Sequence, residues 1–343
     1  MKARVWMAVV TITALISAPF SFAADDEIGI FESLLESSQS FAKTTAALEA
    51  ALAESSLQLH GAHAVRVPDD AHQAKVYVLT SPGYADAAAA EPARTISAQI
   101  LRVAVYTQGD EQTTYVNMAN PVAHAMVFYA DSSDYEALLQ AARNAADEIR
   151  QVVTALPGEA LNRQQDPRRS EKHYRKFKGD GPARMMAKFR TFEKSQLLID
   201  TAPAAEFDAT VDKVTATLAA GSVSDASDST GWDIVATIRL RDDAVYIGIT
   251  NPYIEDKMVR INSRFRSDAK SELSPYPGVD HVTALPTEVL VLKEGDQTRV
   301  VHYGQMWRMQ LYFWDSGYRA FTANVGVPGA IASSIEKAIT GDN

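Results

Sequence analysis

The sequence contains two related halves, and this internal repeat limits the possible folds more than any other feature. Four alignments occur in the same order along both halves. They pair residues 34–52 with 197–218, 76–82 with 245–252, 103–110 with 289–296, and 129–135 with 313–318. Because four ordered matches with slowly changing offsets are hard to obtain by chance, the sequence predicts a duplicated module.

Each copy has the pattern of an α+β module. In the first alignment, the matched residues are spaced four, three and four apart, which puts them on one face of a predicted helix: Phe41, Thr45, Leu48 and Leu52. Short β-branched and aromatic runs that stop at Pro82 and Pro252 are typical of strands followed by turns. Alternating runs around Gly109-Asp110 and Gly295-Asp296 indicate hairpins. With a closing helix in each half, we expect two tandem copies of a two-layer module, an antiparallel sheet with helices packed on one face.

The repeat also sets the expected domain boundaries. The first module is predicted over residues 27–157 and the second over residues 192–341, with a basic linker at 158–191. The second copy carries an inserted loop at about 259–284. Since binding functions concentrate in surface loops, we expect the second copy to be the working half.

The N-terminal residues have the form of a secretory signal peptide. Lys2 and Arg4 precede an apolar run, and Ser21-Phe22-Ala23 offers small residues at the positions that a signal peptidase reads. The run is shorter than the roughly 20 residues of a membrane span. We expect cleavage after Ala23 and no transmembrane segment in the mature chain. The chain contains 0 Cys, which fits the periplasm and excludes disulfides and Cys nucleophiles.

The charge of the chain limits the classes of partner that it can bind. The formal net charge is −10, and an acidic surface disfavours nucleic acid. Residues 162–190 are instead strongly basic. We interpret them as a solvated linker that lies against acidic module surfaces; the alternative is recruitment of an acidic partner or of anionic lipid headgroups.

The second copy is similar to a known family. Its helix opens with Phe207-Asp208 and ends near Gly221, a strand leads into Asn251-Pro252, and residues 285–289 open a hairpin strand. This pattern resembles the family catalogued as domain of unknown function 302. The resemblance implies a compact two-layer α+β fold, and it implies no activity and no catalytic residues. In the first copy Ser81-Pro82 replaces the Asn-Pro pair, so the match there is partial.

The sequence has no phosphate-binding loop, no nucleophile elbow and no zincin motif. Our leading hypothesis is a periplasmic binding or accessory protein that is not catalytic and needs no cofactor. Its ligand would be a small organic anion or a protein, and its oligomeric state stays open. Aromatic side chains beside an arginine are typical of such pockets. The candidate contacts are Asn251, Tyr253, Arg264, Trp307, Arg308 and Trp314.

Two alternatives remain open. An enzyme site would be assembled from the scattered residues Asn251, Asp256, His281 and His302. A copper site would use His302, Met306 and Met309, because imidazole and thioether ligands suit copper. The competing interpretation is that residues 306–309 lead into an aromatic strand that ends at Asp315, with the methionines as core fillers.

Overall fold

The computed structural model describes residues 27–68, 71–109, 111–180, 195–220, 231–265 and 278–341. The predicted signal peptide and Gly221 lie outside these ranges. The described chain forms two antiparallel sheets with helices, so the predicted α+β class is confirmed.

The two copies have the same order of elements. The first contains β1 (Ile28–Ser37), α1 (Phe41–Ala53), β2 (Gln58–Val65), β3 (Ala74–Thr80), α2 (Pro82–Ala87), the 3-10 helix η1 (Ala93–Gln99), β4 (Leu101–Gln108), β5 (Thr113–Ala119), α3 (Pro121–Phe128) and α4 (Tyr135–Thr154). The second contains β7 (Gln196–Pro203), η2 (Ala204–Glu206), α8 (Phe207–Ala220), β8 (Asp233–Arg241), β9 (Ala244–Thr250), α9 (Pro252–Phe265), η4 (Val279–Ala284), β10 (Thr287–Glu294), β11 (Gln297–Tyr303), α10 (Gln305–Phe313), η5 (Trp314–Ser316), α11 (Gly317–Ala323) and α12 (Val327–Thr340).

The sheets confirm the duplication. The strand order is β2-β3-β4-β5-β1 in the first copy and β8-β9-β10-β11-β7 in the second, which is the same topology. Neighbouring strands pair antiparallel in both sheets. The first strand of each copy, β1 or β7, was not predicted. Strand β1 is buried along nearly its whole length, so it lacks the alternation that marks a half-buried strand.

Short helices also follow strands where turns were expected. The prolines that end the runs of β3 and β9 are the first residues of α2 and α9, and Pro121 begins α3. Proline is favoured at the first position of a helix because its missing N–H would have no helical partner there. Ser81 caps α2 by accepting a hydrogen bond from the backbone N–H of Tyr84.

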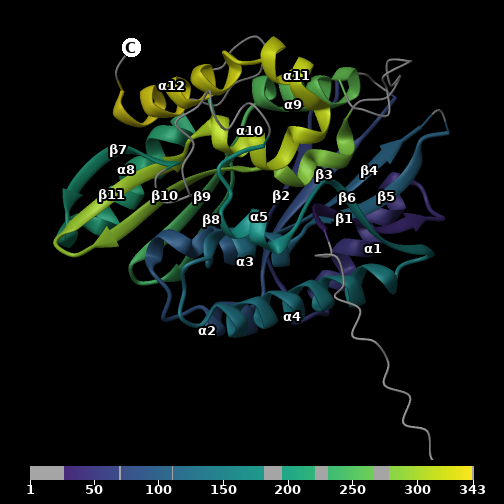
Figure 1. Cartoon of the computed structure of the whole chain (residues 1–343), viewed down its shortest axis with the longest axis horizontal. Coiled ribbons are helices and arrows are strands. Elements are labelled where there is room, and N and C mark those ends of the chain that lie inside the picture. The colour runs from purple at the N-terminus through teal and green to yellow at the C-terminus, as the bar shows by residue number, and fades with distance from the viewer. Residues whose placement is uncertain are drawn as a thin grey trace, which may run out of the picture.

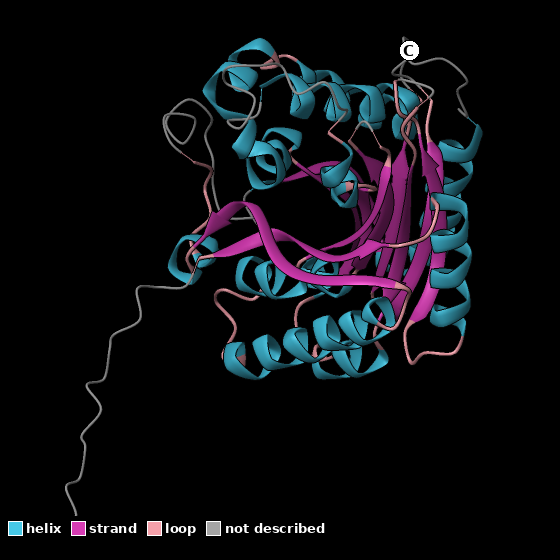
Figure 2. Ribbon diagram, turned by 90° about the vertical axis from the view of Figure 1, so that its right-hand side faces the viewer, coloured by secondary structure: helices cyan, strands magenta, loops and turns pink. Residues whose placement is uncertain are grey.

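Each sheet lies between its own helices and the other copy. Helices α1 and α4 pack on the first sheet, and α8 and α12 pack on the second. The other face of the first sheet contacts η4, and that of the second contacts η1, so the copies exchange their 3-10 helices. Figures 1 and 2 show the strands between helices α9–α12 on one side and α2–α4 on the other. A Cβ at Gly61 in β2 would lie 2.0 Å from the carbonyl oxygen of Val235, so the close approach of β2 to β8 requires glycine here.

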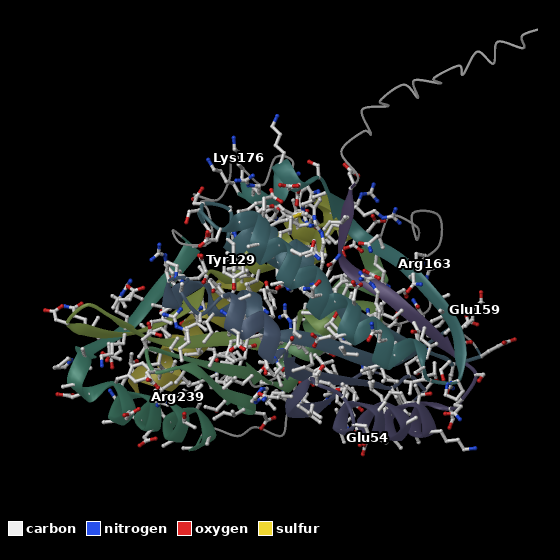
Figure 3. The ribbon with its side chains drawn as sticks, turned by 90° about the horizontal axis from the view of Figure 1, so that it is seen from below. Glu54, Tyr129, Glu159, Arg163, Lys176 and Arg239 are labelled. Carbon is white, nitrogen blue, oxygen red and sulfur yellow. The ribbon has the colours of Figure 1, made fainter. Side chains whose placement is uncertain are left out.

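The predicted basic linker is largely part of the folded structure. Residues Gly158–Arg169 form strand β6, which pairs antiparallel with β1 as a sixth strand of the first sheet. Helix α5 (Glu171–Arg175) follows, and Tyr174 and Phe177 are buried. The interpretation as a solvated linker is therefore wrong for residues 158–177. Glu159 and Arg163 project from the edge of the sheet (Figure 3), whereas residues 181–191 lie outside the described ranges.

A buried ion pair ties β6 to the second copy. Arg169 is 2 % exposed, and its Nη2 lies 2.6 Å from Oδ2 of Asp180. The same guanidinium donates hydrogen bonds to the backbone carbonyl oxygens of Gln310 and Leu311 in α10. It also lies over the Phe177 ring, 4.8 Å from the ring centre. This clamp joins the first sheet, the connecting segment and α10.

Candidate functional site

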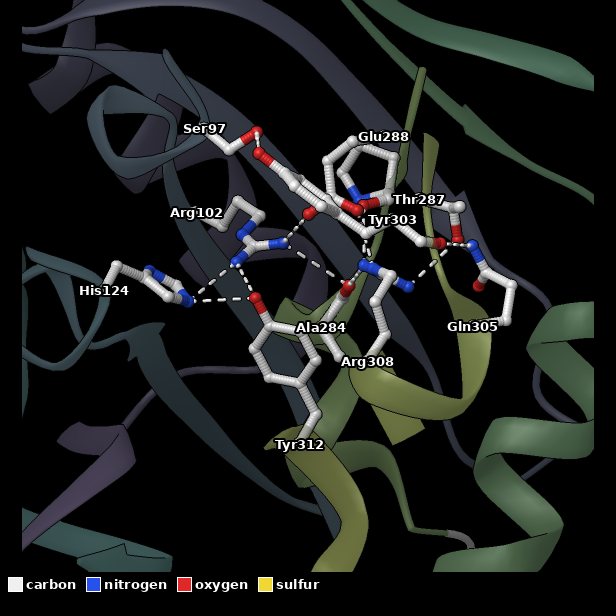
Figure 4. Close-up of polar contacts among 11 residues, drawn as sticks. Ser97, Arg102, His124, Ala284, Thr287, Glu288, Tyr303, Gln305, Arg308 and Tyr312 are labelled. Carbon is white, nitrogen blue, oxygen red and sulfur yellow. Dashed lines mark hydrogen bonds and ion pairs between the residues drawn. The ribbon is translucent and has the colours of Figure 1, made fainter. Parts of the chain in front are cut away.

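A cluster of buried polar side chains lies where the two copies meet (Figure 4). Arg102 is the second residue of β4, and Glu288 is the second residue of the equivalent strand β10. His124 and Arg308 are likewise the fourth residues of the equivalent helices α3 and α10. Each of these four residues is at most 6 % exposed. The cluster is therefore built from two pairs of equivalent positions that face each other across the interface.

Tyr312 links the two first-copy residues of the cluster. Arg102 Nη2 donates a hydrogen bond to the Tyr312 hydroxyl at 2.8 Å, and that hydroxyl lies 2.9 Å from Nε2 of His124. Burial, together with the charges of Arg102 and Arg308, holds the pKa of His124 well below its usual range. The imidazole is therefore neutral. Because Nη2 of Arg102, which can only donate, also lies 3.1 Å from Nε2, this nitrogen is the acceptor and takes a hydrogen bond from the Tyr312 hydroxyl.

Glu288 is the counter-ion of both arginines. Its Oε2 lies 2.6 Å from Nε of Arg308, and its Oε1 lies 3.8 Å from Nη1 of Arg102. Arg308 also donates hydrogen bonds to the carbonyl oxygen of Ala284 at 2.7 Å and to Oγ1 of Thr287 at 3.1 Å. Two guanidinium groups share one carboxylate, so the cluster carries one net positive charge. A buried charge is costly unless it is paired, so this cluster favours an anion beside it.

Arg308 also forms part of the wall of a pocket in the second copy. The cavity has a volume of about 60 Å³ and lies among α9, α10, α12 and the residues after η4. Within the described chain, its charged lining residues are Arg308 and Lys257, and no carboxylate lines it. Most of the other walls are apolar: Ile254, Met258, Leu285, Met309, Phe313 and Ile331. A pocket with this lining suits an anionic group attached to an apolar body.

The equivalent place in the first copy holds two buried tyrosines. Tyr84 is the third residue of α2, as Ile254 is the third residue of α9. Tyr129 follows α3 where the alignment of the copies places Phe313. The two tyrosine rings are 6.4 Å apart in an edge-to-face contact, and both are fully buried. Two buried aromatic rings therefore stand in the first copy at the positions of Ile254 and Phe313.

The ligand contacts predicted from the sequence lie at different places in the structure. Arg308 lines the pocket, but Trp307 next to it points elsewhere and packs edge-on against Phe128 and Phe177 in the interface between the copies. Asn251 caps α9, because its Oδ1 accepts the N–H of Ile254 at 2.9 Å. Both Trp307 and Asn251 therefore have structural contacts that account for their burial.

Two of the other predicted contacts, Tyr253 and Trp314, do not line this pocket. Tyr253 is half-buried, with Nζ of Lys257 5.4 Å from its ring centre. Trp314 packs edge-on against Phe321 and lines a separate shallow depression. The Arg264 side chain lies outside the described residues. Of the predicted ligand contacts, Arg308 lines the pocket, as does Met309 of the predicted copper site, whereas Lys257, Met258 and Ile331 were not predicted.

The residues of the two alternative sites make separate contacts. Asp256 pairs with Arg260 on the surface of α9, whereas His302 is buried 3.6 Å from Glu336 of α12. Met306 and Met309 belong to helix α10, so the prediction that they lead into a strand is wrong. Across the described ranges, no group of three or more His, Cys, Asp or Glu side chains is arranged to hold a metal ion.

His281 is held in a second buried cluster. Its Nδ1 lies 3.2 Å from Oδ1 of Asp280, and its Nε2 lies 3.1 Å from Oδ2 of Asp315. Asp315 belongs to the 3-10 helix η5 rather than to the end of a strand. Burial alone would lower the pKa of His281, but the charges of Asp315 and Asp280 outweigh it and raise the pKa to about 9. The imidazolium thus fixes η4 to η5.

This ion pair makes stability depend on pH. A His whose folded pKa is raised stabilises the fold fully below its unfolded pKa of about 6.5, and this contribution is lost as the pH rises through about 9. We expect His281→Gln to cost about 3 kcal/mol more at pH 6 than at pH 10. Urea unfolding of both proteins between these pH values measures the difference. If the free energies of unfolding of wild type and variant changed with pH in parallel, His281 would not be charged in the folded protein.

Comparisons with known proteins give no relative for this chain. No protein-family model, no curated protein and no solved structure matches it. The similarity to domain of unknown function 302 therefore stays a prediction. In the described ranges, no helix is both long and apolar enough to span a bilayer.

Proposed function

We propose that this protein is a periplasmic, non-catalytic binding or accessory protein whose second copy binds a small organic anion with an apolar body. The observation that carries this proposal is the apolar pocket of the second copy. In the described chain, the charged side chains that line it are the cations Arg308 and Lys257.

The two cations have different surroundings. Arg308 is fixed in the wall by Glu288 and by carbonyl oxygens, and it belongs to a cluster with one excess positive charge. Lys257 is half-buried, so it can adjust to a ligand. An anionic group between them would gain two favourable charge interactions. Salt would screen the interaction with the half-buried Lys257. The low polarity of the walls strengthens the interaction with Arg308.

The size of the pocket limits the ligand. A volume of about 60 Å³ corresponds to about four to six water positions at roughly 10–15 Å³ each. This is room for a carboxylate and a short chain rather than for a nucleotide. Contacts with Met309, Phe313 and Ile331 would add about 25 cal/mol for each Å² of apolar surface buried.

Titration calorimetry with hexanoate and with uncharged 1-hexanol tests the proposal. We expect hexanoate to bind at least about tenfold more tightly, which corresponds to about 1.4 kcal/mol from the charge. Ile331→Trp should remove binding by filling the pocket, and Lys257→Gln should weaken hexanoate by about three- to tenfold while leaving hexanol unchanged. Lys213→Gln is the matched control, because Lys213 lies on α8 in an exposed pair with Asp200.

Equal affinity for the acid and the alcohol, or full binding by Ile331→Trp, would contradict the proposed site. Catalytic turnover of a metabolite that requires Lys257 or Arg308 would contradict the non-catalytic assignment and favour the enzyme alternative.

A further inference from the structure

A second, larger depression lies in the first copy. It is a groove of about 500 Å³ at the junction of the β1–α1 connection with the β4–β5 hairpin. Volumes of about 300–1,000 Å³ are typical of small-molecule sites. The groove is separate from the pocket of the second copy, and no lining residue is shared between them.

The lining of the groove is almost entirely uncharged and polar. Nine of its twelve residues are Ser, Thr or Gln, and the other three are Phe41, Ala42 and Glu111. As far as the chain is described, no Lys or Arg lines it. This chemistry is the opposite of the cationic pocket. It offers many hydrogen-bonding groups, and it offers no charge that would attract an anion.

Internal hydrogen bonds hold part of the wall in place. Ser37 Oγ lies 2.7 Å from Thr44 Oγ1, and Thr107 Oγ1 accepts the backbone N–H of Gln73 at 2.9 Å. Ser40 precedes helix α1 but makes no capping hydrogen bond with its side chain. Its hydroxyl therefore remains at the groove without the role that serine usually has at this position.

The hairpin places a strained residue on the opposite wall. Gln112 has a φ of 53°, in the left-handed region that disfavours residues with a Cβ. A glycine there would relieve this cost of about 1–2 kcal/mol. Strained residues occur preferentially where ligands bind, and Gln112 places a carboxamide in the wall of the groove.

The second copy provides an internal comparison. It has a depression of about 410 Å³ at the equivalent junction, beside the end of β7 and the β10–β11 hairpin. That depression is lined by Ala202, Pro203 and Asp296 together with Thr201 and Gln297. The fold therefore creates a depression in both copies. Among the described residues, nine with a hydroxyl or carboxamide group line the first depression, and two, Thr201 and Gln297, line the second.

We infer that the groove of the first copy binds an uncharged polyhydroxylated ligand, a saccharide. Each Ser, Thr and Gln side chain both donates and accepts hydrogen bonds, and this matches sugar hydroxyls, which do the same. The half-buried ring of Phe41 supplies an apolar surface for the C–H face of a sugar ring. Glu111 disfavours anionic ligands. Because the groove is open to water, the affinity is expected in the millimolar range.

The experiment is a titration of the ¹⁵N-labelled protein with maltose and with cellobiose, each to about 50 mM, followed by amide chemical shifts. At least one sugar should shift the amides of residues 38–42 and 111–114. Gln39→Ala and Gln112→Ala should each weaken binding by about two- to tenfold, as expected for one hydrogen bond. Gln297→Ala in the equivalent depression is the matched control and should leave the affinity unchanged.

Three results would overturn this inference. Neither sugar shifts these amides; the shifts occur but persist unchanged in both glutamine variants; or sodium sulfate shifts the same amides and the sugars do not, which would identify an anion site. None of these results bears on hexanoate binding in the second copy, so the two proposals can fail separately.

Discussion

Replacing Glu288 with Gln should lower the free energy of unfolding by about 3–5 kcal/mol, the usual cost of removing one partner of a buried ion pair. The loss follows from the charges at the interface. Arg102 and Arg308 are 3 % and 6 % exposed, and Glu288 is the carboxylate that lies within 4 Å of both. Without it, two guanidinium groups share the interface with a neutral His124. Urea unfolding at pH 7 measures the change.

Glu294→Gln is the matched control for this experiment. Glu294 pairs with Arg299 at 2.7 Å, but their side chains are 29 % and 33 % exposed, so the pair should contribute less than about 1 kcal/mol. Adding Arg102→Met to Glu288→Gln should restore part of the lost stability, because it removes one of the uncompensated charges. Equal losses in Glu288→Gln and Glu294→Gln would show that the central cluster is hydrated and does not join the copies.

Replacing Arg169 with Met is expected to cost a similar amount, about 3–5 kcal/mol. It leaves the carboxylate of Asp180 buried without its bidentate partner, and it leaves the carbonyl oxygens of Gln310 and Leu311 without their donor. The change should therefore loosen the contact between the connecting segment and α10. Hydrogen exchange should show faster exchange in β6 and α10 together.

The neighbouring residue provides the control. Arg168 pairs with Asp166 at 3.6 Å, and these side chains are 46 % and 63 % exposed. Arg168→Met should change the free energy of unfolding by less than about 1 kcal/mol. A loss for Arg169→Met as small as that for Arg168→Met would mean that residues 158–180 are a loose linker after all.

The repeat in the sequence held more information about the central cluster than its motifs did. The alignment that pairs Val103 with Val289 also places Arg102 opposite Glu288, two residues of opposite charge at equivalent positions. These opposite charges predict an ion pair only if the two copies pack with these positions facing each other. Their mutual packing depends on contacts between distant parts of the chain, and local periodicity does not report such contacts.

In helix α10, the pattern of aromatic residues was interpreted as a strand. The aromatic residues in this stretch suggested alternation along a strand. The buried residues Trp307, Arg308, Leu311 and Tyr312 are instead spaced by one, three and one, which is the repeat of a helix. Similarly, recognising Asn251-Pro252 as a helix start would have placed Lys257 and Met258 on one helix.

Strand β6 could not be predicted in this way. Its twelve residues include Asp166, Pro167 and three arginines, and its burial pattern has no apolar alternation. Charged residues and proline are common on edge strands, where one side of the backbone is free and side chains reach water. Strand β6 forms because β1 offers free backbone hydrogen-bonding groups at the edge of the sheet. That edge exists only in the folded sheet, so the local sequence of β6 does not indicate it.

If an organic anion enters the pocket of the second copy, the methyl groups of the pocket methionines report its binding. Hexanoate should be titrated into protein labelled with ¹³C at the methionine methyl groups. We expect shifts of Met258 and Met309, which line the pocket, and no change at Met118 and Met126 in the first copy. Unchanged Met258 and Met309 resonances at about 10 mM hexanoate, a concentration that saturates even weak sites, would contradict it.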